Sequence, residues 1–220
     1  MNNKYDVIII GAGAAGLMCS FEAGKRGKKV CLLEHSSKIA EKIRISGGGR
    51  CNFTNLFSTD SNFISDNKHF CKSAFAKYTQ NDFIDLVKKH NIQFFEKKLG
   101  QLFCIKSAKD IIDMLVSECI SQKVEIFIDT KIKNLSKDEN SYIVNTDKET
   151  ISSPSIVIAT GGLSIPKIGA TDFGYQIAKQ FNLKVTELTP ALVPLVFEKD
   201  ILDFCKSLAG TSLNLSLIHI

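Results

Sequence analysis

The sequence lacks the features that identify a metalloprotein, a secreted domain or a membrane span. None of its seven cysteines forms a CxxC pair and their number is odd, so zinc-ligand spacing is absent. Several, such as Cys19 and Cys31, stand among apolar residues as buried free thiols do, which favours a reducing compartment. No signal peptide is recognisable, and no apolar run approaches the roughly 20 residues of a membrane helix. We therefore predict a cytoplasmic protein without membrane association.

Strong charge of one sign is also missing. The chain has 28 basic and 23 acidic residues among 220, a net charge of +5, and the basic residues are scattered. The densest run, Lys25 to Lys29, lies where a helix is expected to end. Positive charge there interacts favourably with the negative end of the helix dipole. No nucleic-acid recognition motif is present, so we expect a small-molecule substrate rather than a nucleic-acid partner. The four histidines show neither metal-ligand nor Ser–His–Asp spacing, and we predict no metal and assign no catalytic residue.

The N-terminus does contain a dinucleotide-binding pattern. Gly11, Gly13 and Gly16 fit G-x-G-x-x-G between a run of β-formers at 5–10 and a helix expected over 14–25. A second strand is expected over 29–34, and the order strand, helix, strand indicates an α/β fold. The alternative is a glycine-rich turn in an unrelated α/β protein.

Each part of this pattern has a physical role in nucleotide binding. Gly11 permits a tight turn, Gly13 lets backbone amides approach a pyrophosphate, and Gly16 lets the helix pack on the strand. The helix N-terminus then faces the phosphate charge. Glu34 can accept hydrogen bonds from a ribose 2′-hydroxyl and would repel a 2′-phosphate. The predicted cofactor-binding residues of this unit are Gly11, Ala12, Gly13, Ala14, Ala15, Gly16 and Glu34.

A second glycine-containing turn follows a buried strand predicted at 155–159. That strand ends at "ATGG", and a helix capped by Asp172 is expected over 172–181. If the strand joins the same sheet, Ala159, Thr160 and Gly161 lie near the dinucleotide. Flavoproteins that bind two dinucleotides commonly have such a segment, whereas a plain NAD dehydrogenase does not need it. A generic strand–turn–helix connection is the alternative.

The middle of the chain is predicted in less detail. We expect a short helix over 36–44 carrying Lys42, a polar irregular stretch over 56–72, and one or two amphipathic helices over 73–90. A hairpin over 92–104 should turn near Gly100, and a helix should begin at Ser107. Three short strands are expected after it, at 124–128, 131–135 and 142–146.

The stretch "RISGGGRCNFTN" is the least ordinary in the sequence. Three consecutive glycines indicate a turn, or backbone brought very close to another group. The Arg50 guanidinium carries a positive charge and N–H donors in a fixed planar arrangement. The Asn52 side chain both donates and accepts hydrogen bonds. Cys51 has two interpretations: a thiol whose pKa is lowered by the neighbouring arginine, or a structural cysteine, which we favour.

These motifs together resemble the bacterial BaiN-like FAD-dependent oxidoreductases, some of them aminoacetone-oxidase-like. The resemblance rests on "GAGAAGL", "ISGGGRCNFTN", "ATGGLSIPKIGATDFGY" and "PALVPL", and it spans residues 1 to about 195. It implies a Rossmann-like FAD-binding domain over 1–190, with a parallel central sheet, a β-meander and extra helices. Residues 191–220 would be the start of a second, mostly β, substrate-side domain, and we expect the sequence to end before that domain is complete. Cys104 departs from the family pattern, which usually has proline there.

The resemblance also implies a cofactor site and an activity. The glycine turn should close over FAD, with backbone near Lys131 and Ile132 at the adenine end. The residues added to the predicted site are Lys42, Gly47, Gly48, Gly49, Arg50, Asn52, Ile132, Ala159, Thr160 and Gly161. Hydride would pass through flavin N5, in reduction of a conjugated C=C bond with NAD(P)H as a transient donor or in oxidation of a small amine.

Three alternatives stay open at this point. The first is a single-Rossmann NAD dehydrogenase, and the second is a flavin-bound RNA-modifying or nucleic-acid-binding protein. The third is that this stretch is inactive by itself. The oligomeric state is not predicted.

Overall fold

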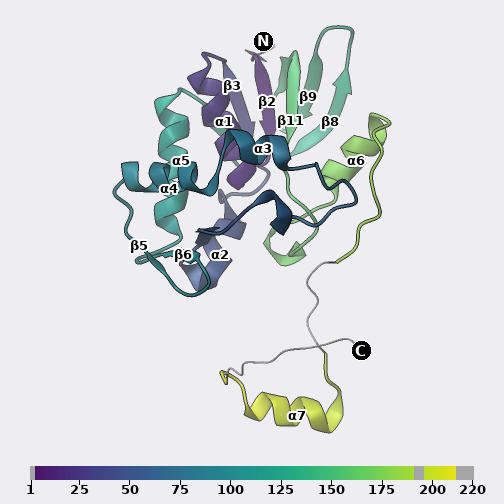
Figure 1. The fold of residues 1–220 in the computed structure, drawn as a ribbon. Helices are drawn as coiled ribbons and strands as arrows, with labels where there is room; N and C mark the ends of the chain where they lie inside the picture. The colour runs from purple at the N-terminus through teal and green to yellow at the C-terminus, as the bar shows by residue number, and fades with distance from the viewer. Residues whose placement is uncertain (1–2, 191–195, 212–220) are drawn as a thin grey trace. The chain divides into compact units, whose positions relative to one another are not determined.

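The computed structural model describes residues 3–190 and 196–211. The chain divides into two compact units, Met1–Val185 and Thr186–Ile220. The first unit contains three sheets and the helices that cover them (Figure 1). The predicted domain boundary at residue 190 stays a prediction.

A four-stranded parallel sheet forms the centre of the first unit. Its order is β11-β2-β3-β7, with β2 at Val7–Ile10, β3 at Val30–Leu33, β7 at Glu125–Phe127 and β11 at Ser155–Ile158. Every residue of β2 and β3 is buried, as expected for parallel strands covered on both faces. The predicted parallel central sheet is confirmed.

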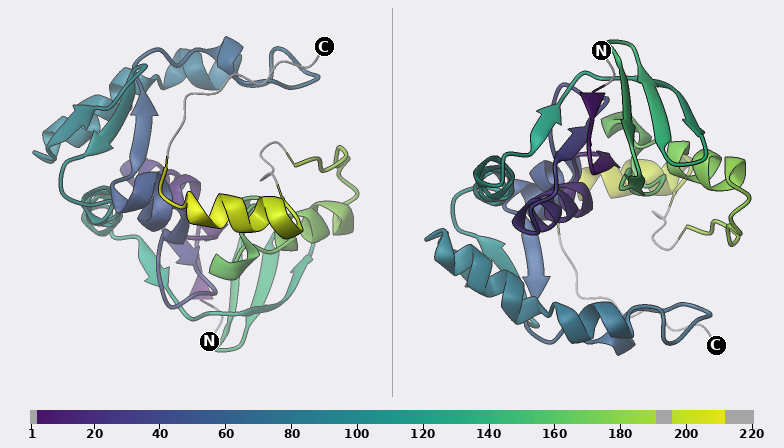
Figure 2. Two further views of the ribbon diagram at one scale, coloured as in Figure 1. Left: turned by 90° about the horizontal axis from the view of Figure 1, so that it is seen from below. Right: turned by 90° about the horizontal axis from the view of Figure 1, so that it is seen from above.

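Alternate residues of these strands enter two different cores. Val7, Ile9, Val30 and Leu32 pack with helix α1, Ala14–Lys25, and helix α5, Lys109–Ser121. The intervening residues, such as Ile8 and Cys31, pack against the opposite layer. The view from above in Figure 2 separates the helical layer from this second layer. The central sheet is therefore the middle of three layers.

The opposite layer is the predicted β-meander. Strands β8, Ile132–Lys137, β9, Tyr142–Thr146, and β10, Thr150–Ser153, pair in antiparallel order, and β1, Asn3–Lys4, adds to β10 in parallel. Strand β10 was not predicted. Helix α6, Phe173–Gln180, packs its buried Ile177 on the same core.

A third, antiparallel sheet holds the segment after the glycine triplet. Its order is β4-β6-β5, with β4 at Asn52–Asn55, β5 at Phe94–Glu96 and β6 at Gln101–Cys104. The predicted hairpin near Gly100 is confirmed as β5–β6, but β4 was not predicted. Between β4 and the next helix, residues 56–71 contain one short 3-10 helix, Asp60–Asn62.

Two helix predictions need correction. The helix expected over 36–44 is α2, Glu41–Gly49, because Ala40 adopts a left-handed conformation (φ 58°) that prevents an earlier start. Residues 46–48 of α2 are not helical in φ and ψ. Asp172 does precede α6, but its side chain accepts a hydrogen bond from Gln176 and caps no backbone N–H.

The helical stretch predicted over 73–90 is two helices, α3 at Lys72–Lys77 and α4 at Gln80–Lys89. They separate because Thr79 is the N-cap of α4: its hydroxyl accepts the Asp82 N–H, and the Asp82 carboxylate accepts the Thr79 N–H. A second 3-10 helix, Pro166–Ile168, lies between β11 and α6.

The second unit contains helix α7, Lys199–Ser207. Within 196–211 there is this helix and no strand, while 191–195 and 212–220 lie outside the described residues, so the predicted mostly β start is not tested there. In the part of the chain that the structure describes, no helix is long and apolar enough to cross a bilayer.

Candidate cofactor-binding site

The carboxyl ends of three neighbouring strands bring the glycine turns together. The Gly11 N–H donates to the Leu33 carbonyl (2.8 Å), and the Ala159 N–H donates to the Ile10 carbonyl (2.8 Å). The turns after β2, β3 and β11 therefore meet at one edge of the sheet, which is where open α/β sheets bind their ligands.

Gly11 and Gly16 are required by packing within the protein. Gly11 has φ +103°, and a Cβ there would lie 2.6 Å from the Ala159 carbonyl oxygen. A Cβ on Gly16 would collide with the Gly11 carbonyl oxygen and would contact Ala159. These two glycines hold the first turn against the turn that follows β11.

Gly13 has a different environment. Its backbone is extended (φ −82°, ψ −170°), and a Cβ there would meet nothing within 4 Å. Helix α1 begins at this residue without a side-chain cap and without an acidic residue in its first turn. Ala14 and Ala15 are exposed. The fold does not need glycine at 13, so open space in front of uncapped helix N–H groups is a cradle that fits a phosphate.

Glu34 is held in place beside this cradle. It is 8% exposed, and its carboxylate accepts the Ala12 N–H (2.8 Å) and the Ser36 N–H (2.9 Å). His35 Nδ1 lies 3.0 Å from the same carboxylate. The oxygen that accepts the Ala12 N–H retains a lone pair for a hydroxyl donor, whereas the other oxygen faces both Ser36 and His35. Ala12 is buried and its N–H is used by Glu34, so it positions this carboxylate.

The predicted adenine end lies along the same edge. The Thr130 N–H donates to the Glu34 carbonyl (2.9 Å), and the Asp129 N–H donates to the Ser36 carbonyl (3.1 Å). Ile132 begins β8 directly afterwards and is partly buried against the meander core. Ile132, the residue predicted from the family resemblance, thus follows by two positions the residue that is hydrogen-bonded to the Glu34 backbone.

The glycine triplet forms a fixed turn. Gly47, Gly48 and Gly49 all have positive φ (57°, 67° and 83°), a conformation that favours glycine. A Cβ on Gly47 would lie 2.6 Å from the Phe103 ring, whereas Gly48 and Gly49 face open space. The Gly49 carbonyl accepts the Ala108 N–H at 2.7 Å, which anchors the turn to the start of α5.

The polar side chains after the triplet differ in exposure. Arg50 and Asn52 are exposed, and the Arg50 guanidinium makes no hydrogen bond or ion pair with residues 3–190 or 196–211. Cys51 is 4% exposed and has φ 53°. Burial raises the pKa of its thiol, and the hydrogen bond with Ser46 offsets this only in part. The interpretation of Cys51 as a thiol with a lowered pKa is wrong.

Lys42 connects two parts of the predicted site. Its Nζ donates to the Gly162 carbonyl at 2.9 Å, and a Cβ on Gly161 would lie 3.4 Å from that Nζ. The Ala40 N–H, just before α2, donates to the Ala12 carbonyl (3.0 Å). The start of α2 is thereby tied to both the first glycine turn and the turn after β11.

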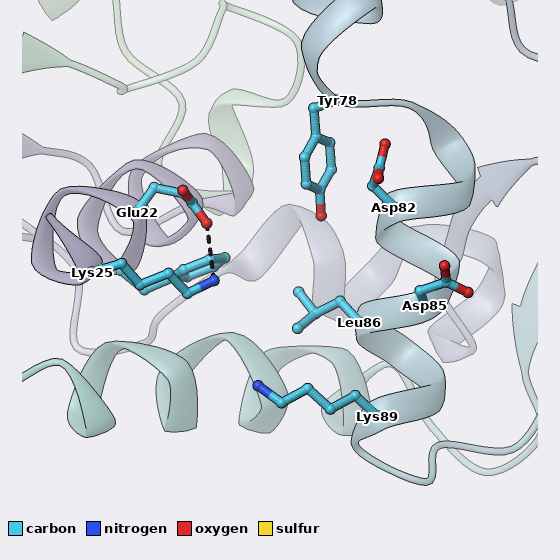
Figure 3. A pocket seen from close by; sticks show the side chains of 8 residues that line it. Glu22, Lys25, Tyr78, Asp82, Asp85, Leu86 and Lys89 are labelled. Atoms are coloured by element: carbon cyan, nitrogen blue, oxygen red, sulfur yellow. Dashed lines mark hydrogen bonds and ion pairs between the residues drawn. The ribbon is translucent and has the colours of Figure 1, made fainter.

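A separate cavity of about 350 Å³ lies beside the other end of α1 (Figure 3). Residues of α1 and α4 line it, together with Tyr78. The lining residues are Phe21, Glu22, Lys25, Tyr78, Asp82, Asp85, Leu86 and Lys89. Its lysines are paired: Lys25 with Glu22 (3.0 Å) and Lys89 with Glu118 (3.0 Å). Its first lining residue on α1, Phe21, comes eight residues after Gly13, roughly 12 Å along the helix from the glycine turn.

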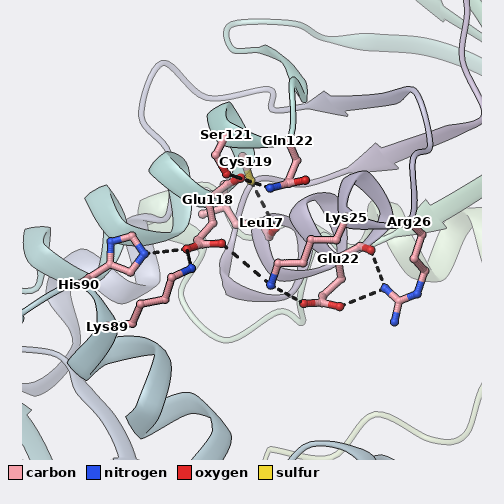
Figure 4. A network of polar contacts seen from close by, with 10 residues as sticks. All are labelled: Leu17, Glu22, Lys25, Arg26, Lys89, His90, Glu118, Cys119, Ser121 and Gln122. Atoms are coloured by element: carbon pink, nitrogen blue, oxygen red, sulfur yellow. Dashed lines mark hydrogen bonds and ion pairs between the residues drawn. The ribbon is translucent and has the colours of Figure 1, made fainter.

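Glu118 is the centre of the polar network next to this cavity (Figure 4). Its side chain is 6% exposed and lies 2.7 Å from His90 Nε2 and 3.0 Å from Lys89 Nζ. Burial acts to raise the pKa of Glu118, but the hydrogen bonds from His90 and Lys89 outweigh it and lower the pKa. Because these partners belong to α4 and its C-cap, the network fastens α5 to α4. Its role is structural, and sequence spacing alone gave no sign of it.

Comparison with known proteins identifies the family. The HI0933-like protein Rossmann domain matches residues 5–202. The chain belongs to this family. It is 48% identical over 95% of its length to the ribosomal RNA dihydrouridine synthase of Escherichia coli, and 42% identical over 99% to that of Haemophilus influenzae. It is 25% identical over 87% of its length to the 3-dehydro-bile acid delta(4,6)-reductase of Clostridium scindens.

The chain spans about half the length of these relatives, 52%, 55% and 47% respectively. Among solved structures, 3-ketosteroid-delta4-(5alpha)-dehydrogenase from Rhodococcus jostii has a similar fold, with a TM-score of 0.53, 15% identity, and coverage of 73% of this chain and 46% of that one. The fold is therefore the Rossmann-like fold of FAD-binding oxidoreductases. The BaiN-like resemblance is confirmed at the level of this wider flavoprotein family, in which the bile-acid reductase is a more distant relative than the two RNA enzymes.

Proposed function

We propose that this chain is the FAD-binding part of a flavoenzyme that reduces uridine in ribosomal RNA to dihydrouridine. The observation that carries the proposal is 48% identity across nearly the whole chain to an enzyme of that name. The proposal takes up the RNA-modifying alternative and sets aside the small-molecule substrate expected from the mild charge.

The chemistry agrees with the hydride transfer expected from the sequence. The C5=C6 bond of uracil is conjugated with the C4 carbonyl, so its reduction adds a hydride at C6 and a proton at C5. Reduced FAD supplies such a hydride when bound. A nicotinamide nucleotide is the donor class that would reduce it, as the sequence resemblance implied.

The residues of this chain have binding and positioning roles in that reaction. The uncapped N-terminus of α1 at Gly13 would hold the pyrophosphate, and Glu34 would accept a hydrogen bond from the adenosine ribose. Arg50 supplies a positive charge, unpaired within the described part of the chain, beside the open side of the Gly48–Gly49 turn. Lys42 would keep the turn after β11 in place.

A second candidate is reduction of a conjugated C=C bond in a small molecule. The relation to the 3-dehydro-bile acid reductase supports it, at 25% identity over 87% of the chain. It shares the cofactor and the direction of reduction with the first proposal and differs in the substrate.

The test uses the full-length, flavin-loaded protein with ribosomal RNA lacking dihydrouridine and with NADH or NADPH. Mass spectrometry of the digested RNA should show uridine gaining two hydrogens, in the presence of the donor only. A Gly13→Ser protein, expected to lack flavin, is the control. If only a 3-dehydro steroid acid is reduced, the second candidate is correct. A protein that purifies without flavin and takes up none contradicts both.

A further inference from the structure

The tip of the third sheet presents apolar and cationic side chains side by side. Phe57, which follows β4, is 69% exposed, and Leu99, in the β5–β6 turn, is 80% exposed. Lys97 and Lys98 precede Leu99 in the same turn and are exposed. We call these four residues the hairpin platform. The cofactor site described above includes none of them.

The backbone that carries the hairpin platform is tightly hydrogen-bonded. The Leu56 N–H donates to the Gly100 carbonyl (2.9 Å), and the Asn55 side-chain amide donates to the Leu99 carbonyl (2.8 Å). The Asn55 side-chain oxygen accepts the Phe57 N–H (2.8 Å). These bonds join two segments that lie more than 40 residues apart in the sequence. The four side chains of the platform therefore extend from a backbone that these hydrogen bonds hold in place.

Gly100 sets the position of the aromatic ring. It has φ +78°, and a Cβ there would lie 2.7 Å from Phe57 Cδ2 and 2.9 Å from Cε2. The Phe57 ring therefore lies against the glycine backbone, and its remaining surface faces solvent. A fixed, exposed aromatic ring is a surface on which a nucleic-acid base can stack.

The charges beside the ring favour an anionic partner. Lys97 Nζ lies 5.3 Å from the centroid of the Phe103 ring, and neither Lys97 nor Lys98 has an ion-pair partner within 3–190 or 196–211. The neighbouring acid, Glu96, forms an ion pair with neither lysine, and its carboxylate accepts the Gly100 N–H (3.0 Å). The platform therefore combines a flat apolar surface with two available ammonium groups.

We propose that the hairpin platform binds an unpaired nucleotide of the RNA substrate, with its base stacked on Phe57 and its phosphates near Lys97 and Lys98. This inference rests on the proposed function. The platform also belongs to the sheet that begins at the cofactor turn: β4 starts at Asn52 and advances roughly 10 Å to Asn55. RNA held at the platform would approach the flavin along this strand.

The first experiment separates stacking from ordinary apolar packing. Binding of a short single-stranded oligouridine, and of the same strand annealed to its complement, is measured with the full-length flavin-loaded protein. Phe57→Leu retains apolar area but lacks a π face, and should weaken single-strand binding about 10-fold. Phe57→Trp retains the π face and should bind as the unmodified protein does. The duplex should bind more weakly and should not distinguish the variants.

The second experiment tests the phosphate contacts. Lys97→Ala combined with Lys98→Ala should reduce the slope of log affinity against log salt by about 1.4, at about 0.7 for each phosphate contact on a single strand. Lys133→Ala combined with Lys137→Ala is the control, since it removes the same charge from two exposed lysines of β8. The control should leave the slope unchanged.

The outcomes distinguish this inference from the function on which it rests. If the protein makes dihydrouridine and Phe57→Leu binds RNA normally, the platform proposal is overturned and the function stands. If Phe57→Leu is normal and Phe57→Ala lowers the melting temperature, another part of the full-length protein covers the ring, which also overturns it. If the unmodified protein neither binds RNA nor makes dihydrouridine, both fail.

Discussion

At the scale of single residues, the three glycines of the first turn have two different causes. Gly11 and Gly16 are required because the Ala159 and Gly11 carbonyl oxygens occupy the places of their side chains. Gly13 has neither a close neighbour nor a positive φ, so its side-chain space is free for a ligand. Sequence reasoning assigned the three roles in this way, and the contacts of Gly11 and Gly16 agree with it.

Gly13→Ser should therefore separate cofactor binding from folding. Serine is a better N-cap than glycine, so the flavin-free protein should be as stable as the unmodified one, or more stable by a few tenths of a kcal/mol. The hydroxymethyl group fills the phosphate cradle, so FAD content should fall at least 10-fold. Absorbance of the purified protein and denaturant unfolding measure the two effects.

Gly16→Ala is the comparison, because it adds a Cβ to another glycine of the same motif, three residues away. Here the clash is with backbone, and unfolding stability should fall by roughly 3 kcal/mol or more. If Gly13→Ser keeps its flavin, or if Gly16→Ala is as stable as the unmodified protein, the division between ligand-facing and packing glycines is incorrect.

Cys51 should be inert despite standing next to Arg50. Burial raises the pKa of its thiol, and burial together with Cys51 raises that of Cys104 to about 12, so both stay protonated in the native protein at pH 8. Iodoacetamide at pH 8 should label them only after denaturation, as peptide mass spectrometry will show. Partly exposed Cys71 is an internal control that should react in the native state. Rapid native labelling of Cys51 would contradict this prediction.

At the scale of helices and strands, Glu118 should stabilise the packing of α5 against α4. Its folded-state pKa lies below the ordinary value of 4.5, so its contribution is present above that pH and is lost as the pH falls through the folded pKa. Glu118→Gln should cost about 1–2 kcal/mol of unfolding free energy at pH 7. Denaturant unfolding across pH 3–7 should show the difference closing below pH 4.5.

Glu22→Gln provides the control on α1. Its side chain is 31% exposed and pairs with the partly or largely exposed Lys25 and Arg26, so its loss should change stability by at most about 0.5 kcal/mol. Equal effects of the two substitutions would show that burial of Glu118 does not matter.

The elements that the sequence predicts best are those with a periodic pattern. Helix α1 has the bounds expected, 14–25, because its apolar face and the flanking glycines define it. Strands β4 and β10 were missed, since "NFTN" and "TISS" are polar and are ordered by pairing with β6 and β9. The late start of α2 depends on the Ala40 N–H bond to the Ala12 carbonyl, a tertiary contact.

At the scale of the whole first unit, the site is assembled from turns that are distant in sequence. Motif spacing predicted the glycines and Glu34, because the βαβ unit fixes their geometry locally. It did not predict that Lys42 reaches a carbonyl 120 residues away, because nothing in a local pattern encodes that contact. The family resemblance supplied Ile132, which follows by two positions Thr130, the residue whose N–H donates to the Glu34 carbonyl.

The Lys42 contact should couple the turn after β11 to cofactor binding. Lys42→Met keeps much of the aliphatic stem and removes the donor to the Gly162 carbonyl, so this turn loses its tie to α2. FAD affinity should fall about 5- to 10-fold, because binding must then order the turn. The melting temperature of the flavin-free protein should change little, since Lys42 is exposed.

Lys38→Met is the matched control, because Lys38 is also exposed, precedes α2 in the chain and makes no side-chain hydrogen bond within the described residues. It should leave FAD affinity unchanged, as measured by titration of the flavin-free protein. Equal losses in the two variants would indicate that only the positive charge near the cofactor matters. A loss confined to Lys42→Met would instead show that FAD binding depends on the connection between α2 and the turn after β11.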